Sequence, residues 1–155
     1  MIRGSSIFDI VASAICALEL IGITVYLLAV WGKLPDLIPG HYNMAGEVTR
    51  WDGKGTLILL LAITWGLFIL ITIVERIPQF WNTAGIKITE ENGARLYKIM
   101  RRMLSTIKLI TVTALVYLTL HTTFATSLPV WFTPVFLFIC LGPVLYFTVR
   151  LYRAR

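Results

Sequence analysis

The sequence predicts an all-α integral membrane protein whose four transmembrane helices form a single domain over residues 1–155. Apolar residues make up 57% of the chain and the mean hydropathy is +0.80, whereas soluble domains are roughly 45–50% apolar. Four apolar stretches reach the length of about 20 residues that a bilayer-crossing helix needs. Basic residues also gather in alternate connecting segments, as in multi-pass membrane proteins.

The four stretches are separated by polar or proline-containing segments. The first is too long for a cleavable signal peptide, and no small-residue cleavage site follows it. Gly142 and Pro143 predict a kink within the last stretch. The predicted spans are 7–31, 56–74, 104–125 and 129–149.

The charge distribution predicts the orientation. Only Lys33, Arg50 and Lys54 fall on one side if the spans alternate. The positive-inside rule then places both termini and the middle loop in the cytoplasm, in a bacterial or archaeal cytoplasmic membrane. The net charge of +6 is interpreted as topology and contact with lipid headgroups, so direct nucleic-acid binding is not expected. The basic residues assigned to the inner side are Arg3, Arg76, Lys87, Arg95, Lys98, Arg101, Arg102, Lys108, Arg150, Arg153 and Arg155.

The first span contains Glu19 near its middle. Insertion of a comparable charge at that depth costs about 2.5–3.5 kcal/mol, which makes such a residue a functional candidate. The alternative is a protonated side chain that hydrogen-bonds a Thr or Tyr of a neighbouring helix, such as Tyr117. An ion pair with Lys108 is disfavoured because the two residues differ in depth by roughly 12 Å.

The outer segment 32–55 follows the first span and is expected to contain the functional residues. Pro35 and Pro39 favour extended backbone, so no helix fits from Leu34 to Pro39. Several glycines supply turn geometry. Donors and acceptors are dense between them.

Two interpretations of this outer loop stay open. In the first, His41 and Asn43 hydrogen-bond the turn backbone, Trp51 seats the loop at the membrane interface, and Lys54 caps it or reaches a lipid phosphate. In the second, the loop contacts an external peptide or lipid directly. The candidate binding residues are Asp36, His41, Asn43, Gly46, Trp51 and Lys54.

In this loop the residues follow the order P-D-x-I-P-x-H-Y-N-x-x-G, and then come Trp51 and Lys54. This order resembles the membrane-embedded domain of unknown function in SdpI-like bacterial toxin-immunity proteins. The resemblance continues downstream in I-T-E-E-N-G-A-R-L-Y-K-I-M-R-R-M-L. It implies a protein that protects a cell from a secreted membrane-active peptide toxin. It also implies, as in some members, signalling through a transcriptional repressor held at the membrane.

The inner loop with an amphipathic helix covers residues 75–103 in this prediction. Thr89 can cap the helix, with Glu90 and Glu91 in the first turn, where acids are favourable. Apolar residues then recur at helical spacing, so the helix lies on the membrane or runs straight into the third span. Its basic side is interpreted as a surface for anionic lipid or a cytoplasmic partner, formed by Arg95, Lys98, Arg101 and Arg102.

The third span contains Lys108 one turn from its predicted start and His121 near its outer end. From its position Lys108 can snorkel to the inner surface. His121 is expected to approach the outer loop as a support for the site. Together with His41, it is a candidate ligand for a divalent metal, with oxygen ligands from the loop carboxylates.

The sequence contains no common enzyme signature, and the two histidines have no diagnostic spacing. The leading expectation, which the resemblance to SdpI-like proteins implies, is a binding protein without a cofactor or catalytic activity. The alternative is a small membrane enzyme that acts on lipid or peptide at the outer face. It would use His41, Asp36, Asn43 and Lys54 with a metal or a phosphate. An oligomer is compatible with both interpretations.

Overall fold

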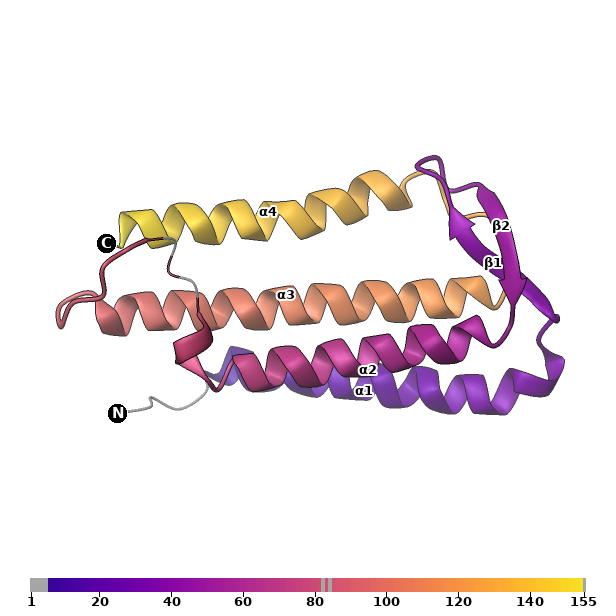
Figure 1. The fold of residues 1–155 in the computed structure, drawn as a ribbon, viewed down its shortest axis with the longest axis horizontal. Coiled ribbons are helices and arrows are strands. Elements are labelled where there is room, and N and C mark those ends of the chain that lie inside the picture. Colours follow the sequence, from indigo (N-terminus) through magenta and orange to yellow (C-terminus); the bar gives the residue numbers. More distant parts are fainter. Residues whose placement is uncertain (1–5, 82, 84, 155) are drawn as a thin grey trace.

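The computed structural model describes residues 6–81, 83 and 85–154, and over these residues it forms an elongated bundle of four long helices (Figure 1). All four are long and apolar enough to cross a membrane, as predicted. Arg3 and Arg155 of the predicted inner side lie outside the described residues. The helices are α1 (Ile7–Val30), α2 (Thr56–Val74), α3 (Gly93–Thr122) and α4 (Phe132–Arg153).

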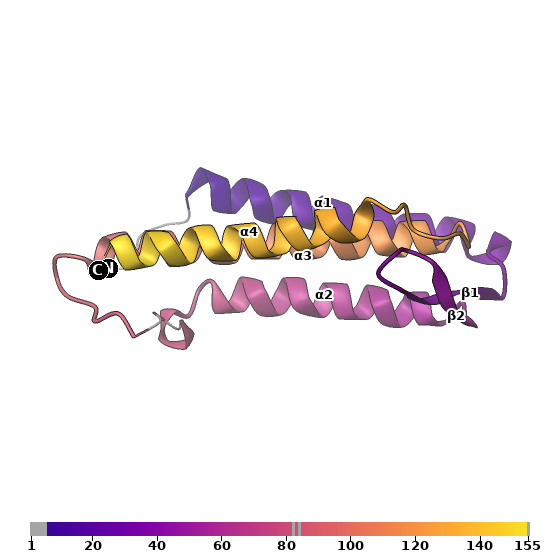
Figure 2. The same ribbon diagram turned by 90° about the horizontal axis from the view of Figure 1, so that it is seen from above.

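Helix α3 is the centre of the bundle. Helices α1, α2 and α4 each pack along it, and α1 also touches α2. Figure 1 shows α1 and α2 on the side of α3 that faces away from α4, and in the view of Figure 2 they flank it. The start of α1 and the end of α4 lie at one end of the bundle, here called the terminal end, and a small β-hairpin lies at the other, the hairpin end (Figure 1).

Helix α1 begins with a capping box. Asp9 donates its backbone N–H to Ser6 Oγ at 3.3 Å, and Ser6 donates its own backbone N–H to Asp9 Oδ2 at 2.9 Å. These bonds satisfy two amide groups that a helix start leaves without partners. Ser6 is therefore the N-cap of α1.

The hairpin is an element that the sequence analysis did not predict. Strand β1 (Leu37–Tyr42) pairs antiparallel with β2 (Val48–Gly53), with register irregularities on either side of His41. Pro39 fits within β1 because a two-stranded sheet has only edge strands, where a missing N–H is tolerated. A one-turn 3₁₀ helix, Trp31–Lys33, joins α1 to the hairpin. The predicted outer loop is therefore a folded unit.

The region expected to form an amphipathic helix is the first part of α3. Among the described residues no separate helix of this kind precedes the third span, because α3 is continuous from Gly93 to Thr122. The prediction placed the cap of this helix at Thr89, but α3 begins later, at Gly93. Thr89 and Asn92 instead hydrogen-bond each other, backbone N–H to side-chain oxygen in both directions, at 2.8 and 3.3 Å.

The apolar side of this segment packs against helix α4. Leu96 and Met100 of α3 are buried in one cluster with Phe147 and Leu151 of α4. This packing gives α3 and α4 a common core at the terminal end, where a helix lying on the membrane would have none. Helix α4 continues through Pro143 as one helix.

Candidate functional site

The hairpin is held together by contacts among its own charged residues. Lys54 Nζ lies 3.1 Å from Asp36 Oδ1, which joins the entry and the exit of the hairpin. Arg50 forms a second ion pair at 2.9 Å with Asp52 Oδ2. Exposed pairs of this kind contribute little stability, about 0–1 kcal/mol each. They do bring two of the three loop acids into contact with basic partners within the loop.

The hairpin tip is built around Asn43. Its side-chain oxygen accepts the backbone N–H groups of Ala45 and Glu47, both at 2.9 Å. Its amide donates to Glu47 Oε2 at 2.8 Å. The interpretation that Asn43 holds the turn backbone is confirmed. His41 has a different partner, since its Nδ1 lies 2.7 Å from Thr49 Oγ1 across the strand pair.

Gly46 docks the tip onto the connection between α3 and α4. Its φ is +85°, and a Cβ at this position would lie 2.5 Å from the carbonyl oxygen of Leu128. In return, the Leu128 N–H donates to the Gly46 carbonyl at 2.8 Å. Tyr42 adds a hydroxyl contact to the Thr126 carbonyl at 3.4 Å, and its partial burial raises the pKa of the phenol. Only glycine satisfies both the backbone angle and the close approach.

Between the hairpin and the membrane helices lies a cleft of about 710 Å³, called here the outer cleft. Its hairpin side carries polar groups, including His41 and Asn43, beside the exposed side chain of Met44. Its helix side, formed by α2, α3 and α4, is apolar. The apolar residues on the helix side are Leu57, Leu59, Leu60, Ile63, Leu118 and Phe132.

The predicted binding residues are not all in this cleft. The outer cleft is lined by His41 and Asn43, whereas Asp36, Trp51 and Lys54 lie outside its lining. The Trp51 side chain is exposed on β2, and Lys54 contacts Asp36. Gly46 acts through the docking of the tip.

The two histidines of the predicted metal site have different surroundings. Over the described residues, no group of three or more His, Cys, Asp or Glu side chains is placed to hold a metal ion. His121 lies instead among aromatic rings, 5.8 Å from Tyr117 and 6.3 Å from Phe124 between centroids. Of the residue set proposed for the enzyme alternative, His41 and Asn43 line the outer cleft, and Asp36 contacts Lys54.

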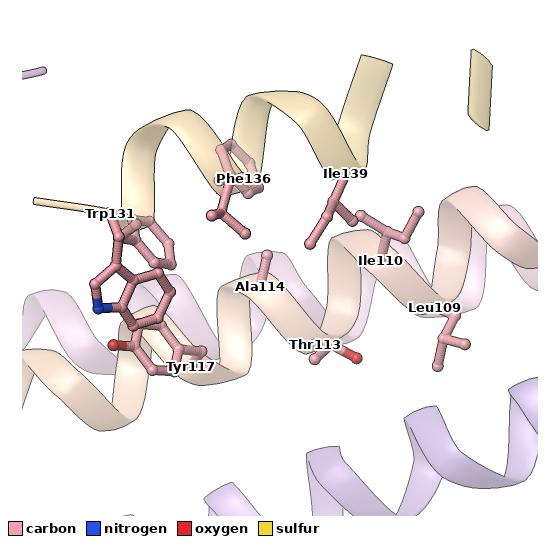
Figure 3. Close-up of a pocket in the computed structure, with 10 residues that line it drawn as sticks. Leu109, Ile110, Thr113, Ala114, Tyr117, Trp131, Phe136 and Ile139 are labelled. Carbon is pink, nitrogen blue, oxygen red and sulfur yellow. The ribbon is translucent and has the colours of Figure 1, made fainter. Parts of the chain in front are cut away.

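Glu19 has a partner on a neighbouring helix, but not the tyrosine that the sequence suggested. The Thr113 hydroxyl lies 3.0 Å from each of the two carboxylate oxygens. Tyr117 instead stacks on Phe132, with 5.1 Å between the ring centroids. Thr113 also lines an apolar pocket of about 320 Å³ between α3 and α4, which Tyr117 and Trp131 flank (Figure 3). Glu19 therefore borders the bundle interior rather than the hairpin.

A buried polar cluster at the terminal end was missed by sequence reasoning. Lys108 is 0% exposed. Its Nζ lies 2.6 Å from Glu75 Oε2 and 2.8 Å from the Ser13 hydroxyl. The prediction that Lys108 snorkels to the surface is wrong, because its ammonium group is bound inside the bundle. The cluster comprises Asp9, Ser13, Thr72, Glu75, Arg101, Ser105 and Lys108.

The second half of this cluster is centred on Asp9. Its carboxylate accepts the Ser105 hydroxyl at 3.1 Å and lies 3.4 Å from Arg101 Nε. One signal in the sequence could have indicated the cluster. Glu75 and Lys108 adjoin long apolar runs, and charged residues that become buried are almost always paired. The cluster links α1, α2 and α3 at the terminal end, which is opposite the hairpin.

The four basic residues predicted to form one inner surface have separate environments. Arg95 and Lys98 are exposed on α3. Arg101 contacts Asp9 within the polar cluster. Arg102 lies over the ring of Phe8, with its guanidinium carbon 4.8 Å from the centroid. The structure thus separates two free-standing surface charges from two that contact α1.

Residues 20–65 match the family model described as a domain of unknown function, DUF1648. The matched segment runs from the middle of α1 through the whole hairpin into α2. An uncharacterized protein of Archaeoglobus fulgidus is 28% identical over 159 residues, which cover 89% of this chain and 86% of the relative. No solved structure matches the chain.

Proposed function

We propose that this chain is a non-enzymatic immunity protein of the SdpI-like type, which binds a membrane-active peptide toxin at the hairpin end. In this proposal it sits in the cytoplasmic membrane of a bacterium or archaeon, with both termini inside. The hairpin end then faces the side from which a secreted peptide arrives. The orientation follows from the positive-inside rule.

The outer cleft is the observation that carries this proposal. Membrane-active peptides form amphipathic helices that lie in the membrane interface, with a polar face toward the headgroups and an apolar face toward the acyl chains. The cleft has the same two faces. His41 and Asn43 make its hairpin side polar, and Leu60 and Ile63 make its helix side apolar. Binding of an amphipathic helix in an apolar groove is a common recognition mode.

The hairpin supports binding because its conformation is held before a ligand arrives. Asn43 fixes the tip, Gly46 docks it on Leu128, and Lys54 ties its exit to Asp36. A binding surface that is already ordered loses less conformational entropy on association. Captured peptide would be unable to assemble or insert elsewhere in the membrane, which gives immunity without turnover.

A signalling role is a second part of the proposal. Arg95 and Lys98 are exposed near the start of α3 at the terminal end. They are available to an acidic surface on a cytoplasmic repressor, whereas Arg101 is occupied by Asp9. Loss of repressor recruitment in an Arg95→Glu/Lys98→Glu variant, with immunity retained, would separate the two roles.

Cell survival tests the binding role. Cells that express the protein are challenged with a panel of secreted membrane-active peptides, alongside cells with Met44→Asp and Leu37→Asp variants. Both residues are exposed and apolar on the hairpin, but only Met44 lines the outer cleft. We expect protection against at least one peptide to be lost in Met44→Asp and kept in Leu37→Asp. Equal protection by all three proteins, at equal membrane levels, would contradict the proposal.

A further inference from the structure

A second surface groove lies at the terminal end, between the start of α1 and the facing sides of α3 and α4. Its volume is about 530 Å³. Arg102 of α3 and Arg150 of α4 supply the charge, and no acidic residue lines it. The remaining lining is Phe8, Thr106, Gly142, Pro143, Tyr146 and Phe147.

The two arginines are positioned by aromatic rings rather than by acids. The Arg102 guanidinium lies 4.8 Å from the Phe8 centroid, and that of Arg150 lies 5.7 Å from the Tyr146 centroid. Arg150 also donates to the Tyr146 hydroxyl at 3.3 Å. Cation–π contacts hold a guanidinium in place without neutralising it. Its remaining N–H groups stay available to an anion.

The two arginines of the groove differ from the neighbouring cations, which are paired with acids. Lys108 and Arg101 each contact a carboxylate, at 2.6 and 3.4 Å. Among the described residues, neither Arg102 nor Arg150 takes part in an ion pair. The terminal end therefore neutralises the cations inside the bundle and leaves two uncompensated charges in one groove at its surface.

The position of the groove fits the headgroup level of a membrane. Arg150 lies in the last turn of α4 and Arg102 in the first half of α3. Phe147 and Pro143 continue the groove along α4 toward the middle of the span. A phospholipid has the same layout, with a charged phosphodiester at the surface and apolar chains below it. Basic pockets between membrane helices are known to bind anionic headgroups.

We propose that this groove is a binding site for one anionic phospholipid. Arg102 and Arg150 donate to its phosphodiester, which two guanidinium groups can do with charge-assisted hydrogen bonds. Tyr146 and Pro143, which line the groove, contact the glycerol and the first part of an acyl chain. The site lies at the opposite end of the bundle from the outer cleft. Its test is therefore independent of the immunity proposal.

Native mass spectrometry in a neutral detergent tests the site, with phosphatidylglycerol and phosphatidylcholine as the two probes. The site variant is Arg102→Gln/Arg150→Gln. The control is Arg95→Gln/Arg153→Gln, which removes the same net charge from exposed positions outside the groove. Thermal unfolding in lipid-free detergent verifies that each variant is folded. All four arginines are exposed, so folding is expected to survive.

The wild type and the control are expected to bind one phosphatidylglycerol with affinities within about twofold of each other. The site variant should bind it at least about tenfold more weakly, because hydrogen bonds to a charged group are lost. An equal loss in both variants would show diffuse attraction and overturn the proposal. Equal binding of phosphatidylcholine would overturn it as well. Displacement of the lipid by an equal concentration of inorganic phosphate would reassign the groove to free phosphate.

Discussion

Removal of one partner of the Lys108–Glu75 pair should destabilise the bundle strongly. Lys108 is 0% exposed, and the Glu75 side chain that it contacts at 2.6 Å is 6% exposed. Lys108→Met leaves the Glu75 carboxylate buried without its cation, and Glu75→Gln leaves the ammonium group buried without its anion. Loss of one member of a buried pair costs about 3–5 kcal/mol.

The double variant Lys108→Met/Glu75→Gln separates this effect from a general loss of packing. It removes both charges, so no uncompensated charge stays inside the bundle. Replacement of a whole buried pair is often close to neutral. The double variant should therefore be more stable than either single variant, by about 2 kcal/mol or more, a strong non-additivity between contacting residues.

Thermal unfolding in detergent measures the four proteins beside Lys98→Met, a control at an exposed lysine of the same helix. Each single variant should lower the melting temperature by on the order of 10 °C, and the control should leave it nearly unchanged. Additive effects in the double variant, or single variants as stable as the control, would refute the reasoning that the pair is buried and mutually dependent.

Three further substitutions test the hairpin and the mid-span carboxylate. Gly46→Ala should cost about 2 kcal/mol, because alanine is strained at positive φ and would meet the Leu128 carbonyl; thermal unfolding measures it, and no change would argue against the docked tip. Asn43→Ala should speed amide hydrogen exchange at the tip, because two backbone N–H groups lose their acceptor; unchanged exchange would contradict the Asn43 turn. Glu19→Gln should change stability by less than about 1 kcal/mol, because an amide oxygen still accepts from Thr113; a large loss would show that the charge itself is required.

The sequence was sufficient to predict the four helices, because length and hydropathy determine a membrane span almost alone. The bounds of α2 were predicted as the structure has them, since Gly55 and Glu75 limit an uninterrupted apolar run. The start of α3 was harder to predict from the sequence. Thr89 has the composition of a helix cap, but its side chain and that of Asn92 stabilise a separate turn just before Gly93.

The hairpin could not be predicted from local patterning. Strands are usually recognised by alternating apolar and polar residues, but β1 reads LIPGHY and buries the adjacent Ile38 and Pro39. Its tip is instead held by a residue far along the chain, Leu128 in the connection between α3 and α4, which donates to the Gly46 carbonyl. The asparagine of the tip was predictable, because Asn side chains commonly hydrogen-bond nearby backbone N–H groups.

The buried polar cluster depends on tertiary structure. In sequence, Lys108 lies about one turn inside a predicted span, and snorkelling is the usual outcome there. In the structure α3 begins at Gly93, so Lys108 lies near the middle of the helix, beside Ser13 and Thr72. Its side chain reaches toward the terminal end, as expected, but meets Glu75 first. Only the packing of α1 and α2 around α3 makes this contact possible.

Peptide binding in the outer cleft is tested most directly with a cleft-filling variant. The protein is reconstituted in lipid nanodiscs, and fluorescence anisotropy follows a labelled peptide against which the cells are protected. Ile63→Trp adds bulk in the cleft, whereas Ile69→Trp adds the same bulk at an exposed position of α2 outside it. We expect Ile63→Trp to weaken binding at least tenfold and Ile69→Trp to bind like the wild type. Equal affinities for all three proteins would contradict the assignment of the outer cleft as the toxin-binding site.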